Sequence, residues 1–187
     1  MADPLRAERV TLRDGRAVVV RPASVDDAEE TFKNINLIGA EQVYIMIDRI
    51  DNVDEERRWL SSFDGIRSVL LLALAGREVV GSADCHGGTY PKDRHVGGIG
   101  IVVRDGWREV GLGRLLMERI LEWMRAQGLE KAELAVFATN DRARRLYESL
   151  GFVEEGVRRG HVRIRGAYVD EVLMGLWLKR SARSGVP

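Results

Sequence analysis

A glycine-containing turn, between an expected strand and an expected helix, carries residue types that can hold a phosphate. Residues 108–113 read REVGLG; they follow the β-branched run 99–103 and precede a segment with apolar residues at helical spacing. The first N–H groups of a helix lack partners and attract anions, and glycine lets a ligand approach them. An ordinary strand-to-helix turn also needs glycine, so this turn alone leaves a phosphate site and a purely structural role open.

The turn differs from two common phosphate-binding patterns. The P-loop pattern G-x-x-x-x-G-K-[ST] is absent, and the dinucleotide pattern G-x-G-x-x-G lacks its third glycine because Leu116 stands there. The turn instead has the form R-x-x-G-x-G, made by Arg108, Gly111 and Gly113.

A second stretch, ATNDRARRLYESLGF at 138–152, places an asparagine after an expected strand and a tyrosine on the helix that follows. Asn140 and Tyr147 are seven residues apart, which is two helical turns, so both side chains can face the same side. From the residues alone, Asn140 can simply cap the helix, and Tyr147 can simply extend the apolar stripe of Ala143 and Leu146.

In this order and at this separation, the two stretches resemble the two signature motifs of the GNAT N-acetyltransferase family, near its ribosomal-protein and small-amine branch. The resemblance covers nearly the whole chain, from about residue 16 to 178. It implies an α/β protein with the GNAT (acyl-CoA N-acyltransferase) fold, a mixed twisted sheet of about seven strands with helices on both faces. It further implies an enzyme that moves an acetyl group from acetyl-CoA to a primary amine by direct attack in a ternary complex, without a metal.

The resemblance also implies roles for individual residues. Main-chain groups of Val102 and Val103 would pair with the pantetheine arm as an added strand pairs with a sheet edge. The turn would bind the pyrophosphate, Asn140 would bind the pantetheine arm, and Tyr147 would serve the leaving thiolate. The implied cofactor-binding residues are Val102, Val103, Arg108, Val110, Gly111, Leu112, Gly113, Arg114, Asn140, Ala143 and Tyr147.

Two proton transfers define the catalytic residues to look for. A phenol near pKa 10 is a weaker acid than a thiol near 8.5, so we expect Tyr147 mainly to stabilise the thiolate by a hydrogen bond. The amine needs a base, because a lysine-like amine is uncharged in only about one molecule in 2,500 at pH 7. Relatives in that family often place a glutamate where Gly98 stands here. The remaining candidates are Glu41, which is favoured because its segment borders the acceptor in relatives, then Asp84, His86 and His95, or a chain of water molecules.

Composition sets limits on the wider function. A chain of 187 residues with 29 basic and 29 acidic side chains predicts one domain (1–187, core 16–178, flexible ends 1–9 and 180–187) and no nucleic-acid partner. Cys85 is the sole cysteine and only three histidines occur, so neither a disulfide nor a metal centre is expected. No apolar run is long enough to span a membrane, which predicts a cytoplasmic location. A homodimer is possible by analogy with the family.

The periodicity of the sequence predicts alternating strands and helices. The unit from 96 to 138 should form two parallel strands joined by a helix, with a ligand where the strands part at their C-terminal ends. Residues 40–50 are ambiguous because nearly every position is apolar. Strands are expected at 16–21, 68–75, 78–85, 96–103, 131–138, 152–163 and 167–178, with helices at 24–36, 54–63, from 112 to before Gly128, and at 140–150.

Several functional alternatives remain at this level. A small-molecule amine is weakly favoured as acceptor over a protein N-terminus. A non-catalytic acyl-CoA-binding regulatory module is disfavoured by the Asn140–Tyr147 pair, because binding alone needs no acid. An unrelated nucleotide-binding domain is disfavoured by the missing third glycine. The basic residues of the last hairpin, between Arg158 and Arg165, form either a solvated face or a rim that selects an acidic acceptor.

Overall fold

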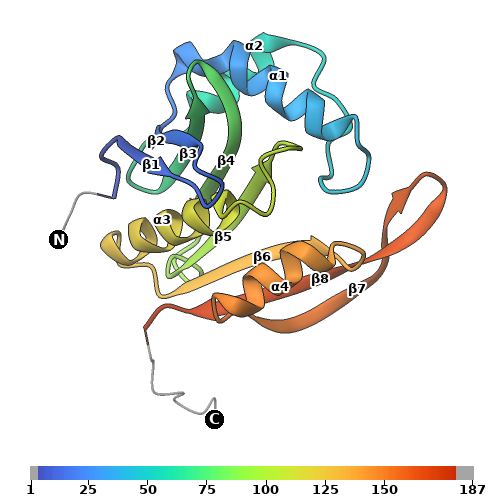
Figure 1. The fold of residues 1–187 in the computed structure, drawn as a ribbon. Coiled ribbons are helices and arrows are strands. Elements are labelled where there is room, and N and C mark those ends of the chain that lie inside the picture. The colour runs from blue at the N-terminus through green and yellow to red at the C-terminus, as the bar shows by residue number, and fades with distance from the viewer. Residues whose placement is uncertain (1–3, 180–187) are drawn as a thin grey trace.

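The computed structural model describes residues 4–179, which form one eight-stranded sheet with helices on both faces (Figure 1). The sheet order is β1-β2-β3-β4-β5-β6-β8-β7. The predicted α/β class, a mixed sheet with helices on both faces, is therefore confirmed. The strands are β1 (Glu8–Thr11), β2 (Ala17–Pro22), β3 (Ser68–Ala75), β4 (Glu78–Gly87), β5 (Val96–Val103), β6 (Lys131–Phe137), β7 (Val153–Ile164) and β8 (Ala167–Trp177); the α-helices are α1 (Ala28–Gly39), α2 (Val53–Leu60), α3 (Leu112–Ala126) and α4 (Asp141–Ser149).

Two hydrophobic cores hold the helices to the sheet. The larger core includes the apolar face of α3, and the smaller one joins Ala28 and Leu60 of the α1–α2 layer to the opposite face. Strand β3 serves both cores, because Leu71 contributes to the first and Leu70 and Leu72 to the second. This explains why its sequence is a continuous apolar run rather than an alternating one, as predicted for a strand buried on both faces.

Strands β5 and β6 form the one parallel pair of the sheet, and they separate soon after they begin. Their register holds from Val96↔Lys131 to Gly98↔Glu133 and then stops, while all other neighbouring strands run antiparallel. The predicted parallel strand–helix–strand unit is confirmed. Beyond these pairs the second half of β5 and of β6 face a gap, and the sheet is split into two wings (Figure 1).

The N-terminal region departs from the sequence-based expectation. Residues 1–9 were expected to be loose, but β1 begins at Glu8 and pairs antiparallel with β2, which raises the strand number from about seven to eight. The pairing partner and an ion pair between Glu8 and Arg119 of α3 (2.9 Å) hold this polar segment. Neither can be seen in the local composition of residues 8–11. Residues 1–3 of the expected flexible N-terminal end and the expected flexible tail at 180–187 lie outside the described residues.

The bounds of the first two helices differ from the sequence-based expectation. The first expected helix begins with a 3₁₀ turn, Val25–Asp27, that Ser24 and Asp27 close with a capping box, and α1 then continues to Gly39. The second begins after Asn52, whose side chain accepts from the N–H of Asp54 (2.7 Å). The ambiguous residues 40–50 form neither helix nor strand, and they lie in the long connection between α1 and α2.

Candidate active site

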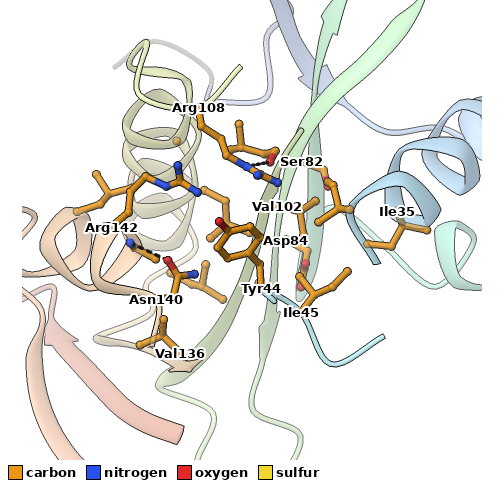
Figure 2. Close-up of a pocket in the computed structure, with 18 of the residues that line it drawn as sticks. Ile35, Tyr44, Ile45, Ser82, Asp84, Val102, Arg108, Val136, Asn140 and Arg142 are labelled. Carbon is orange, nitrogen blue, oxygen red and sulfur yellow. Dashed lines mark hydrogen bonds between the residues drawn. The ribbon is translucent and has the colours of Figure 1, made fainter. Parts of the chain in front are cut away.

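A cavity of about 810 Å³ lies where β5 and β6 part. Its walls come from the second halves of these two strands, the turn before α3, the first turns of α4, and the α1–α2 layer with its connecting loop. Figure 2 shows Val102 and Val136 from the two separating strands, with Tyr44 of the loop lying across the opening between them. The cavity therefore occupies the position predicted for a ligand.

The turn before α3 presents unpaired backbone donors. Gly111, with a φ of 94°, caps α3, and the first helical hydrogen bond runs from Leu115 to the Gly111 carbonyl (3.1 Å). Within residues 4–179 no acceptor is assigned to the N–H groups of 110–114. Gly111, Gly113 and Arg114 line the cavity. Val110 and Leu112 do not, since Leu112 is buried in the core, so only their main-chain N–H groups remain available to an anion.

The side chain of Arg108 is bonded to the loop that connects α1 and α2. Its Nε donates to the Val103 carbonyl (2.8 Å), and its two terminal nitrogens bond both carboxylate oxygens of Glu41. Its guanidinium also lies 4.6 Å from the centroid of the Tyr44 ring, and Arg142 of α4 lies on the same ring at 5.4 Å. Arg108 thus connects the α1–α2 loop to the turn at residues 108–113, which we call the phosphate-type turn. Figure 2 shows Arg108, Tyr44 and Arg142 in this arrangement.

Hydrogen bonds to the neighbouring strands show which main-chain groups of β5 face the gap. The N–H of Arg104, just after β5, donates to the Val80 carbonyl of β4 (2.9 Å), whereas the His95 carbonyl, just before β5, accepts from Glu130 on the β6 side (2.8 Å). Backbone groups of a strand point alternately to its two sides. Even-numbered residues of β5 therefore bond to β4, and odd-numbered residues face β6.

This alternation changes one predicted contact. The main chains of Ile101 and Val103 face the gap, but that of Val102 is paired with Ser82 of β4. Val102 can only offer its side chain, which does line the cavity. Because Arg108 occupies the Val103 carbonyl, the free edge consists of the N–H and carbonyl of Ile101 and the N–H of Val103.

The start of α4 brings the second predicted group to the same cavity. Asn140 caps the helix through Oδ1, which accepts from the N–H of Ala143 (3.2 Å), and its amide NH₂ stays available, so capping and ligand binding are compatible. Ala143 and Tyr147 also line the cavity. Tyr147 is 6% exposed, packs against Phe152 with ring centroids 6.0 Å apart, and burial raises its pKa, so its hydroxyl stays protonated.

The structure separates the candidate bases that the sequence left open. Glu41 does not line the cavity, and Arg108 engages both of its oxygens. His95 stacks on Trp177, with centroids 6.2 Å apart, and does not line the cavity either. His86 is half exposed and contacts the ring of Phe63, with centroids 4.8 Å apart and the ring planes tilted by 39°. Of the four candidates, the cavity wall contains only Asp84.

Asp84 is positioned by the glycines of the neighbouring strand. It pairs with Gly100, where an added Cβ would come within 2.5 Å of its Oδ1. Two residues along the same face, a Cβ at Gly98 would meet open space. An acid on β4 therefore lies close to Gly98 of the neighbouring strand. Burial raises the pKa of Asp84, and His86, with its Nε2 3.8 Å from Oδ2, opposes that rise.

The remaining reactive and charged residues that the sequence suggested do not contribute chemistry to the cavity. Cys85 is fully buried, and burial raises its pKa to about 12, so it is a core thiol rather than a nucleophile. No group of metal-ligating side chains occurs among residues 4–179. Two of the four arginines of the basic hairpin are neutralised, because Arg158 bonds Glu171 and Arg159 bonds Asp170, each at 2.8 Å.

The fold, the split parallel strands and the unpaired turn define a transferase of the acyl-CoA type. The chain belongs to the acetyltransferase (GNAT) family, whose model matches residues 39–152, more than half of its length. The predicted family is therefore confirmed. Within the described residues, no helix has the length and apolar character needed to cross a membrane.

Individual relatives point to two kinds of acceptor. The L-amino acid N-acetyltransferase AaaT of Escherichia coli is 31% identical over 128 residues, which cover 66% of this chain and 75% of that protein. The ribosomal protein alanine N-acetyltransferase of Salmonella typhimurium is 36% identical over 76 residues, and the match covers 41% of this chain but only 51% of the relative.

Solved structures agree with the fold over most of the chain. A GNAT-family acetyltransferase from Streptococcus pneumoniae superposes with a TM-score of 0.80 at 28% identity, covering 86% of this chain and 99% of that one. The yncA protein of Salmonella typhimurium, solved with its cofactor acetyl-CoA, also gives 0.80, over 91% and 99% of the two chains; at 21% identity this likeness speaks for the fold alone.

Proposed function

We propose that this chain transfers an acetyl group from acetyl-CoA to the primary amine of a small molecule, by direct attack in a ternary complex. The observation that carries this proposal is the free edge of β5, at Ile101 and Val103, ending beside the unpaired N–H groups of 110–114. An extended, amide-bearing arm that ends in a diphosphate matches this sequence of donors and acceptors. Acetyl-CoA has that chemistry, whereas a free nucleotide does not use the strand edge.

In the reaction, the uncharged amine nitrogen attacks the acetyl carbon, a C–N bond forms and the C–S bond of the thioester breaks. Asp84 accepts the proton that the amine must lose, and its raised pKa makes it a better base than an ordinary carboxylate. Tyr147 donates a hydrogen bond to the leaving thiolate. Because burial raises its pKa, full transfer of its proton is unfavourable, and water supplies the proton of the free thiol.

A small acceptor fits the shape of the acceptor half better than a protein N-terminus does. This half lies between the sheet face of Asp84 and the α1–α2 layer, and the loop between the two helices lies against it, held by Arg108 through Glu41. Arg165 of the last hairpin adds a bond to the Glu41 carbonyl (3.0 Å). A peptide chain would have to displace this loop. The cytoplasmic location and the homodimer stay predictions.

Replacing Gly113 with valine tests the cofactor site. A Cβ there would already lie 3.3 Å from Leu146 Cδ2, and the added methyl groups would cover the donors of the turn. We expect the Kd for acetyl-CoA, measured by calorimetry, to rise by about tenfold or more, since each hydrogen bond to a charged group contributes about 1.5–3 kcal/mol.

Gly156→Val is the matched control, because an added Cβ at Gly156 meets open space in β7. It should bind acetyl-CoA like the parent protein. Unchanged affinity in Gly113→Val, with both variants folded by circular dichroism, would move the diphosphate away from this turn and overturn the proposed function.

A further inference from the structure

The helix-side wall of the cavity contains two buried acceptor groups that have no cationic partner among residues 4–179. Asn34 of α1 is 2% exposed, and its Oδ1 has no hydrogen-bond partner among residues 4–179. Glu56 of α2 is 4% exposed, and no ion pair to it occurs in the same range. Both side chains line the cavity. We call this pair the helix-side pocket.

Such groups are costly unless a ligand completes them. An unsatisfied buried acceptor destabilises a protein, and a buried carboxylate normally has a cationic partner. Burial raises the pKa of Glu56, and a hydrogen bond from Thr31 only partly opposes this. The hydroxyl of Thr31 has a single proton, which it shares with the carbonyls of Asp27 and Ala28 (3.0 and 3.1 Å), so little of it is left for Glu56. The pocket therefore lacks a donor, preferably a positively charged one.

The surface between this pocket and Asp84 is apolar. Asp84 lies on the sheet side of the cavity, and Figure 2 shows Ile35 of α1 and Ile45 of the loop on the side facing it. A chain of methylene groups suits such walls, because its burial is favourable and it requires no hydrogen bonds. The other apolar residues of the cavity on α1, α2 and their connection are Ile38, Met46, Ile47, Ile50 and Trp59.

The distribution of charge distinguishes the two halves of the cavity. The lining cations without a recorded ion pair in the described chain, Arg13, Arg142 and Arg145, lie on the β1–β2 turn and on α4, beside the proposed cofactor site. The acceptor half instead holds Asp84, Glu55 and Glu56; of the other lining acids, Glu171 pairs with Arg158 and Glu109 lies in the turn before α3. An anionic donor and a cationic acceptor would each meet groups of opposite charge.

Resting on the proposed function, we propose that the acceptor is a diamine or an amine with a distal guanidine, whose second cation binds the helix-side pocket of Asn34 and Glu56. The first amine is acetylated: its nitrogen bonds the acetyl carbon, the C–S bond breaks, and its proton passes to Asp84. The second cation takes no part in bond making. It holds the acceptor by pairing with Glu56 and donating to the Oδ1 of Asn34.

The test compares three acceptors of matched length: 1,5-diaminopentane, pentylamine and 5-aminopentanoate, with thiol release as the assay. We expect kcat/KM for the diamine to exceed that for the monoamine by about tenfold or more, the factor that one charge-assisted hydrogen bond provides. The amino acid, with a carboxylate at the distal end, should be the poorest of the three. Equal kcat/KM for diamine and monoamine would overturn the proposal.

Glu56→Gln and Asn34→Leu locate the second cation. Each should raise KM for the diamine by about tenfold and leave KM for pentylamine within about twofold, because only the diamine uses the pocket. Glu122→Gln, the same change at an exposed position of α3, should alter neither. Thermal melts check that the variants are folded. Asn34→Leu is the second variant because it removes an acceptor without a partner, so its loss should not destabilise the protein. An equal rise in KM for 1,5-diaminopentane and for pentylamine, in folded variants, would contradict the assignment.

Binding separates this inference from the proposed function. If none of the amines is acetylated, calorimetry of 1,5-diaminopentane into the CoA complex still reports on the pocket. Binding that Glu56→Gln weakens would support the pocket while the proposed reaction fails. Absence of diamine binding to the CoA complex would overturn the pocket, whatever happens to acetyl-CoA.

Discussion

Asp84→Asn is expected to lower kcat by about 10²–10⁴-fold, the usual contribution of a general base. Asparagine keeps the shape that fits across Gly100 but cannot accept the proton of the amine. Acetyl-CoA affinity should stay within about twofold, because Asp84 faces the acceptor half and not the phosphate-type turn. Steady-state thiol release and calorimetry on the same preparation measure the two quantities.

Glu41→Gln is the matched comparison, since Glu41 was the base that the sequence favoured. Its carboxylate holds Arg108 and does not line the cavity, so its loss should cost much less in kcat than the loss of Asp84. The opposite order of effects, with Glu41→Gln nearly inactive and Asp84→Asn active, would return the base role to Glu41.

Asp84→Asn, which is expected to lower kcat, is also expected to raise the stability of the protein at neutral and alkaline pH. Burial raises the pKa of Asp84 in the native state above its ordinary 3.8, so the native state binds the proton more tightly than the unfolded state does. Stability contributed by this group is therefore present below pH 3.8 and is lost as the pH rises through the raised native pKa. Urea unfolding of Asp84→Asn relative to the parent should show a gain at pH 8 that is absent at low pH.

Tyr147→Phe is expected to reduce kcat by about 10²-fold, in the range measured when one donor to a developing anion is removed. The hydroxyl lies in the cavity wall with a raised pKa, so it is a neutral donor throughout the working pH range. Phenylalanine preserves the packing against Phe152 and the core, so Kd for acetyl-CoA should change by no more than about twofold. Single-turnover thiol release measures the chemical step directly.

Tyr168→Phe provides the control, because Tyr168 is 76% exposed on β8 and removal of its hydroxyl should leave kcat unchanged. Full activity in Tyr147→Phe would remove this residue from the chemistry. A large loss of acetyl-CoA affinity without a change in kcat would instead assign Tyr147 to cofactor binding.

Features that depend on local sequence could be predicted from it. The apolar run of β3, the helical stripe of α3 and the cap at Asn140 each follow from neighbouring residues, and the structure places them within a few positions of the prediction. The parting of β5 and β6 was also accessible, because a helical crossover imposes parallel strands and ligands bind where such strands diverge.

Features that depend on pairing between distant segments could not be predicted. Asp84 lies in the cavity wall because the register of β4 on β5 sets it across Gly100, and no pattern in residues 78–87 encodes that register. The edge role of Ile101 in place of Val102 follows from the hydrogen bond of Arg104 to β4. The helix-side pocket forms only because α1 and α2 pack side by side, so the sequence does not indicate that Asn34 and Glu56 lie in one cavity wall.

The split between β5 and β6 has a mechanical consequence. Asp84 belongs to the wing that ends at β5, whereas Tyr147 follows β6 in the other wing, and only three residue pairs of the sheet ladder join the two. A donor molecule that fills the gap contacts both wings, and it thereby fixes the distance between Asp84 and Tyr147. Catalysis should thus obey a compulsory order, with the thioester seated first and the amine second.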